Sequence, residues 1–108
     1  MNSSSMKTTN EATGLTAHEL GLMESVFRRH PEVSLVKLFG SRAKGTHRVR
    51  SDVDLAVWGT AGALQAEAIA GELDELPLPY QFEVHSFEHI SNHALREHIQ
   101  RVGISVFR

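Results

Sequence analysis

The sequence has no cysteine among its 108 residues. This absence excludes a disulfide framework and thiol chemistry, and it is in keeping with a reducing cytoplasm. No apolar run approaches the roughly 20 residues that a membrane-spanning helix needs. The N-terminal residues also lack the apolar core of a signal peptide. We therefore expect a cytoplasmic protein that does not insert into a membrane.

The sequence also has no net positive charge and few aromatic side chains. The formal net charge is -2 and aromatic residues make up 6% of the chain. Nucleic-acid binding usually needs a basic surface and aromatic side chains on which bases stack, so we expect no stable binding of nucleic acid. The remaining composition is ordinary for a globular protein. Length predicts one domain over residues 15–108, preceded by a flexible polar tail over residues 1–14.

Hydrophobic spacing predicts alternating helices and strands. The predicted helices cover 15–31, 63–77 and about 91–102, and the predicted strands cover 33–39, 53–58, 80–87 and 103–108. The first helix begins with Thr16 and Glu19 in the spacing of a capping box. In the second helix, the residues expected to face inward are Leu64, Ala68, Leu73 and Leu76.

The first candidate site is the end of the strand over 33–39, at Gly40-Ser41. Glycine lets the backbone turn sharply and lets a ligand approach closely. A helix that starts at Ser41 would point free N–H groups at the same spot, which favours phosphate. Arg42 and Lys44 add positive charge nearby. The segment therefore predicts phosphate binding, and the alternative is a capped turn with solvated basic side chains.

The second candidate site is the pair Asp52 and Asp54. Residues two apart on a strand face the same side, so these carboxylates repel each other unless a cation lies between them. Oxygen ligands of this kind suit magnesium, together with waters and substrate phosphates. The alternative is an aspartate pair in a solvated turn.

The positions of the two candidates make the combination stronger than either alone. If the strands over 33–39 and 53–58 are antiparallel neighbours, Gly40 lies beside Asp52. A phosphate-binding turn would then meet metal-binding carboxylates, as phosphoryl or nucleotidyl transfer requires. Two-metal chemistry usually needs a further carboxylate, and Glu83 is the candidate, because an unpaired glutamate is costly to bury. The alternative for Glu83 is an edge-strand residue that faces water.

Two segments carry a resemblance to a known family. GSRAKG at residues 40–45 and SDVDLAV at 51–57 closely resemble the nucleotidyltransferase signature, in which Gly-Ser is followed by Asp-x-Asp on the next strand. The small size and the GSRAxG form resemble the minimal nucleotidyltransferases (MNT) of the DNA polymerase β-like superfamily. The resemblance extends over about residues 16–107. It implies an α+β fold like the polymerase-β palm, with a small mixed sheet and helices packed on it.

The resemblance also implies Mg²⁺, in a possible two-metal site, and ATP as the nucleotide substrate. The third acidic residue of the family is usually an aspartate in a strand like PYxxDV, where this chain has Glu83. This departure lengthens the side chain by one methylene and bears on catalysis more than on metal binding. The expected catalytic and metal-binding residues are Asp52, Asp54 and Glu83, and the expected triphosphate-binding residues are Gly40, Ser41, Arg42 and Lys44.

The resemblance further implies a partner. Minimal members are often encoded beside a helical HEPN-type toxin, act as its antitoxin, and in some cases transfer AMP onto a toxin tyrosine. The leading hypothesis is therefore an adenylyltransferase that modifies a HEPN-type partner. The second hypothesis is a non-catalytic module of the same fold that neutralises a helical partner by contact. A free sheet edge near the C-terminal GISVF segment could also pair with another copy of the chain.

Seven histidines raise the question of a zinc site. His89 and His93 are four residues apart, a spacing that lets two histidines share zinc on one helix. However, Ser91-Asn92 is typical of a helix start and would break that geometry, which favours solvated histidines. His85 is expected to share a strand face with Glu83 and receives no role.

Overall fold

The structure is a computed structural model that describes residues 9–10, 14–40, 52–59 and 62–108. In chain order its elements are β1 (Thr9–Asn10), β2 (Leu15–Thr16), α1 (Ala17–Phe27), β3 (Leu35–Phe39), β4 (Val53–Trp58), α3 (Ala63–Asp74), β5 (Phe82–Ser86), the 3-10 helix η2 (Phe87–His89), α4 (His93–Val102) and β6 (Ile104–Phe107). The expected α+β class and the expected order of the main elements are confirmed. The division into a tail and a domain stays a prediction, and β1, inside the expected tail, pairs antiparallel with β2.

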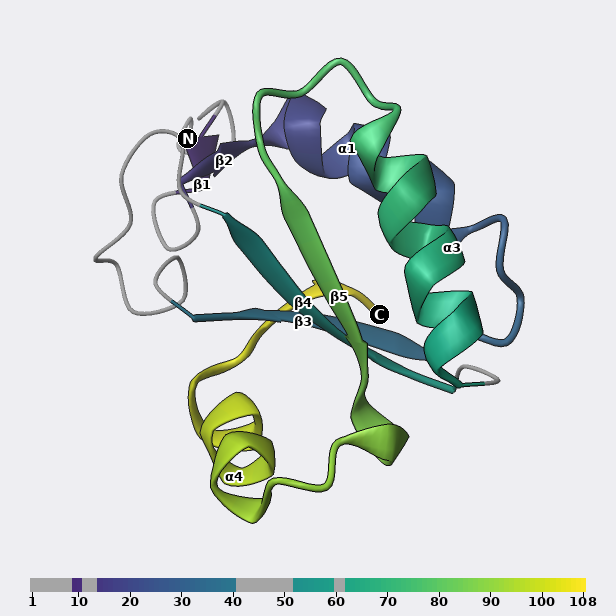
Figure 1. Ribbon diagram of the computed structural model, residues 1–108. Coiled ribbons are helices and arrows are strands. Elements are labelled where there is room, and N and C mark those ends of the chain that lie inside the picture. The colour runs from purple at the N-terminus through teal and green to yellow at the C-terminus, as the bar shows by residue number, and fades with distance from the viewer. Residues whose placement is uncertain (1–8, 11–13, 41–51, 60–61) are drawn as a thin grey trace.

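The main sheet has four strands in the order β5-β4-β3-β6. β3 runs antiparallel to both β4 and β6, whereas β4 and β5 are parallel, so the sheet is mixed. Figure 1 shows β5 crossing in front of β3 and β4, with its two ends leading to α3 and to η2. Because β3 and β4 pair antiparallel, the end of β3 at Gly40 lies next to the start of β4 at the two aspartates.

Alternation along β4 divides the sheet into two different faces. Val53, Leu55 and Val57 are fully buried and belong to the larger core under α1 and α3. The intervening side chains point to the opposite face because successive residues of a strand alternate. On that face Ala56 and Trp58 join a smaller core with α4, which lies on the side of the sheet away from α1 and α3 (Figure 1).

The helices begin close to where the sequence predicts them. Thr16 and Glu19 form the complete capping box of α1, as expected. In α3, the inward positions expected at Leu64 and Ala68 are wrong: Leu64 is 83% exposed. The buried stripe of that helix follows helical spacing through Ala66, Ile69 and Leu73, of which only Leu73 was expected.

Across the parts of the chain that the structure describes, none of the helices is both long enough and apolar enough to cross a membrane. β5 and β6 form the two edges of the main sheet. Within the part of the chain that the structure describes, the sheet edge expected near the C-terminus lies at β6, and pairing with another copy there stays a prediction.

Candidate functional site

The end of β3 and the start of β4 meet, as expected, but the carboxylate directly beside Gly40 is that of Asp54, where Asp52 was expected. Phe39 pairs with Asp54 across the two strands, so Gly40 follows directly beside this carboxylate. A Cβ added to Gly40 would overlap Asp54 Oδ2 and lie 3.2 Å from its Cγ. Gly40 also has a φ of +80°, in the left-handed region that side chains other than glycine's rarely adopt. The local geometry therefore requires glycine at this position for two independent reasons.

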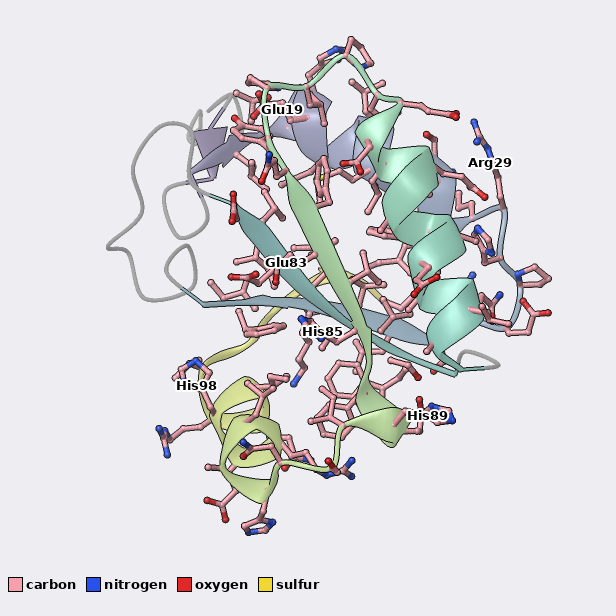
Figure 2. The ribbon with its side chains drawn as sticks, in the orientation of Figure 1. Glu19, Arg29, Glu83, His85, His89 and His98 are labelled. Carbon is pink, nitrogen blue, oxygen red and sulfur yellow. The ribbon has the colours of Figure 1, made fainter. Side chains whose placement is uncertain are left out.

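Glu83 lies beside Asp54 on the neighbouring strand. The two residues are register partners in the parallel pair of β4 and β5, so both side chains point to the face that also carries α4. Figure 2 shows Glu83 in the middle of the molecule, on β5. Its side chain is 60% exposed because β5 is an edge strand. The expectation of a glutamate on a core strand is wrong, and its alignment with Asp54 is what connects it to the site.

The carboxylates at this end of the sheet influence one another electrostatically. The pKa of Asp54 is raised, first by burial and then by the negative charges of Glu83 and Asp52, while His85 acts in the opposite direction. Asp52 itself is exposed, just before β4. These carboxylates repel one another, and a divalent cation bound between them would remove this repulsion. Magnesium binds such oxygen ligands together with phosphates and waters. The donor set therefore fits magnesium.

The structure brings together part of the expected site. Gly40, Asp52, Asp54 and Glu83 lie at one end of the sheet. Among the residues described, no three His, Asp or Glu side chains form a group that could hold a metal ion. The expected triphosphate contacts Ser41, Arg42 and Lys44 lie outside the described residues.

His85 is the neighbour of this site to which the sequence analysis assigned no role. Its Nε2 lies 3.9 Å from Oε1 of Glu83, and its ring centroid is 5.8 Å from that of Phe39. His98 of α4 contacts the same phenylalanine edge-on, at 6.5 Å between ring centroids. The sequence indicated this proximity in one way only: His85 and Glu83 are two residues apart on a strand and therefore share a face.

The remaining histidines do not form the zinc pair considered from the sequence. His89 Nδ1 lies 2.9 Å from Ser86 Oγ within the turn of η2, whereas His93 Nε2 pairs with Glu97 at 3.1 Å. Asn92 separates them as the N-cap of α4, which confirms the expected helix start.

We predict that Asp54→Asn stabilises the metal-free protein at neutral pH. Because the pKa of Asp54 is raised on folding, the folded state binds this proton more readily than the unfolded state. The free energy of unfolding of the unaltered chain therefore falls as the pH rises from the ordinary aspartate value of about 3.9 through the raised pKa. Asparagine does not titrate, so after allowance for solvent screening we expect a gain of about 0.5–1 kcal/mol at pH 7.

Thermal unfolding in EDTA at pH 4 and pH 7 measures this effect. The gain should be larger at pH 7, where the unaltered carboxyl is ionised. Asp74→Asn makes the same change at an exposed position at the end of α3 and should show no such difference. An equal gain from Asp54→Asn at both pH values would contradict the prediction.

Comparison with known proteins places the fold. A chain of a toxin–antitoxin complex crystallised with AMP-PNP matches with a TM-score of 0.68 and 21% identity, over 81% of this chain and 71% of that one. A chain from the complex of tri-AMPylated Shewanella oneidensis HEPN toxin with MNT antitoxin matches with a TM-score of 0.63 and 17% identity, over 82% of this chain and 69% of that one. At these identities the likeness shows the fold alone. A comparison with curated proteins gives no match.

The sequence also matches a family model directly. The model describes the polymerase beta nucleotidyltransferase domain, and the match covers residues 23–108. It includes β3, β4 and β5, the three strands that bring Gly40, Asp54 and Glu83 together. This chain therefore belongs to the polymerase beta nucleotidyltransferase family.

Proposed function

We propose that this protein transfers AMP from ATP onto a tyrosine hydroxyl of a HEPN-type partner protein and thereby acts as an antitoxin. The observation that carries the proposal is the alignment of Asp54 with Glu83 next to the glycine turn at Gly40. Nucleotidyl transfer needs a triphosphate-binding turn and metal-binding carboxylates at one place, and the alignment gives Gly40 and these carboxylates that proximity.

In the proposed reaction the acceptor oxygen attacks the α-phosphorus of ATP. A new oxygen–phosphorus bond forms, the bond from the α-phosphorus to the bridging oxygen of the β-phosphate breaks, and pyrophosphate leaves. The acceptor proton passes to a carboxylate of the cluster Asp52, Asp54 and Glu83. Bound Mg²⁺ would neutralise charge on the phosphates, and these three carboxylates are the residues we assign to hold it.

The triphosphate is assigned to the turn after β3. The absence of a side chain at Gly40 lets the backbone lie directly against the Asp54 carboxylate, so a triphosphate at this turn would lie next to a metal-binding carboxylate. Ser41, Arg42 and Lys44 follow in the sequence and supply a hydroxyl and two positive charges, so we propose them as further triphosphate contacts.

Two structural relatives support AMP as the transferred group and a HEPN-type protein as acceptor. One relative was solved with AMP-PNP, and the other is a complex that contains a tri-AMPylated HEPN toxin and an MNT antitoxin. This chain shares its fold with chains of those two complexes, and this likeness supports AMP transfer to a HEPN-type protein as its proposed reaction.

The alternative is a module of this fold that neutralises its partner by contact. Two observations favour it: the third carboxylate is a glutamate that is 60% exposed, and no three acidic or histidine side chains of the described residues form a group that could hold a metal. A weak metal site would reduce catalysis without affecting a binding surface elsewhere.

Intact-mass spectrometry tests the proposal. The purified chain is mixed with the protein encoded by the neighbouring gene and with each nucleoside triphosphate in turn, once with Mg²⁺ and once with EDTA. We expect the neighbour to gain the mass of one or more AMP groups with ATP and Mg²⁺ only. No gain with any triphosphate, despite a stable complex, would contradict transfer for this pair and support the contact module.

A further inference from the structure

The strand order gives the candidate site two sides, one at the end of β3 and one at the edge strand β5. Gly40 follows β3, Asp54 lies on the central strand β4, and Glu83 lies on β5. In an in-line displacement the leaving pyrophosphate and the attacking oxygen lie on opposite sides of the α-phosphorus. With the triphosphate at the Gly40 turn, the acceptor therefore approaches from the side of Glu83. That side is the edge of the sheet, because β4 is the one neighbour of β5 in the main sheet as described.

A cavity of about 360 Å³ lies along this same strand edge. Val84, His85 and Ser86 of β5 line it on one side, directly after Glu83 in the strand. The other walls come from the first turns of α3, from the segment after η2 and from the start of α4. Figure 2 shows the labelled side chains Glu83, His85 and His89 following one another along β5 and η2.

His85 connects the cavity with the carboxylates. It lines the cavity and also lies 3.9 Å from Glu83, so the two features are continuous. From Glu83 to Ser86 is three residues, or about 10 Å along an extended strand. An extended peptide that runs beside β5 covers the same distance in about three residues.

The walls of the cavity suit one large side chain that is mainly apolar. Apolar atoms, among them those of Ala66, Val84 and Leu95, supply most of the lining surface. Six of the eleven lining residues carry polar groups: Glu67, His85, Ser86, His89, Ser91 and Asn92. Small-molecule and side-chain pockets commonly combine an apolar lining with a few polar groups in this way. An aromatic or long aliphatic side chain of a peptide therefore fits better than a charged one.

We propose that this cavity is the acceptor-docking site: an extended segment of the partner protein runs along the edge of β5 and places one large apolar side chain in the cavity. The acceptor hydroxyl of the same segment then lies about three residues away, beside Glu83 and Asp54. This inference rests on the proposed transfer to a protein hydroxyl and adds where that protein is held.

Filling the cavity tests the proposal. Ala63 and Glu67 line it from α3 and are both exposed, so Ala63→Trp and Glu67→Trp should fold. We expect each to raise the KM for the neighbouring gene's protein about tenfold or more, and to weaken direct binding of that protein by the same factor. The KM for ATP should not change. Ala68→Trp is the matched control, because Ala68 is exposed on the same helix and does not line the cavity.

The outcomes separate this inference from the proposed function. If transfer occurs and neither cavity variant changes the KM for the protein acceptor, the docking site is wrong and the proposed function stands. If the unaltered chain binds the neighbour without transfer, and the cavity variants weaken that binding, the docking site stands and catalysis fails. If the unaltered chain neither binds nor modifies the neighbour, the proposed partner and the docking site both fail.

The position of the anchoring side chain gives a second test. Alanine substitutions are made in the partner at each residue within five positions of the modified tyrosine. The loss of affinity should concentrate on one large apolar residue about three positions away. An even distribution of small losses would overturn the proposal.

Discussion

The variant Asp52→Asn/Asp54→Asn is expected to lose AMP transfer while it keeps its partner. Asparagine has nearly the shape of aspartate but no negative charge, so the two amides no longer attract Mg²⁺ at the end of the sheet. Asp54 is the central residue of the cluster, with Glu83 beside it in the sheet and Gly40 next to its carboxylate. We expect kcat to fall on the order of a thousandfold or more, because the remaining carboxylate cannot position and neutralise a triphosphate alone.

Partner binding provides the internal comparison. The acceptor-docking site lies along β5 and does not include either aspartate, so the dissociation constant of the complex should stay within about threefold. Asp74→Asn, at the exposed end of α3, is the matched control and should retain both transfer and binding. If the double variant neutralises its partner in cells as well as the unaltered chain does, the contact module replaces the enzyme as the best account of this protein.

The sequence predicted the central part of the site because the two metal-binding residue types are spaced by two, which is the period of a strand. Two acidic residues spaced two apart, ahead of a run of buried residues, place both carboxylates at one end of β4. A glycine at the end of the preceding strand then meets them if the two strands form an antiparallel pair. Local sequence therefore fixes most of this geometry, and the family resemblance identified the chemistry.

Glu83 shows where this reasoning stops. Its alternation with Phe82 and Val84 predicted the correct face of β5 but left open whether β5 is an inner or an edge strand, and the structure shows the edge strand that was the alternative. Strand order depends on long-range packing, and a strand of five residues carries no local signal for it. Glu83 is consequently not a buried charge, although it lies where the family's third acidic residue was expected.

The acceptor-docking site could not be predicted for the same reason. Its lining comes from α3, β5 and the start of α4, and no spacing pattern relates these segments. The inward stripe of α3 was also misjudged, since Leu64 is a large apolar residue that faces solvent. The register of a helix around its own axis is set by what it packs against, and an alanine-rich helix gives weak information about that.

The variant Gly40→Ala is expected to lose activity because the added methyl group displaces the Asp54 carboxylate. A Cβ on residue 40 would overlap Oδ2 of Asp54, so either the Asp54 side chain must rotate or the strand end must shift. The φ of +80° adds a backbone penalty of about 1–2 kcal/mol for alanine. Both changes act at the point where the triphosphate turn meets the carboxylates, so we expect kcat to fall about a hundredfold or more and the free energy of unfolding to fall by about 1–2 kcal/mol.

Gly71→Ala distinguishes this local effect from a general effect of removing glycine. Gly71 lies within α3, and a Cβ there would meet nothing within 4 Å. Alanine should raise the free energy of unfolding by about 0.5–1 kcal/mol at this position and leave transfer unchanged. A Gly40→Ala protein that unfolds at a lower temperature yet transfers AMP at the unaltered rate would show that Asp54 moves freely. In that case its contact with the glycine turn has no part in positioning the carboxylate for catalysis.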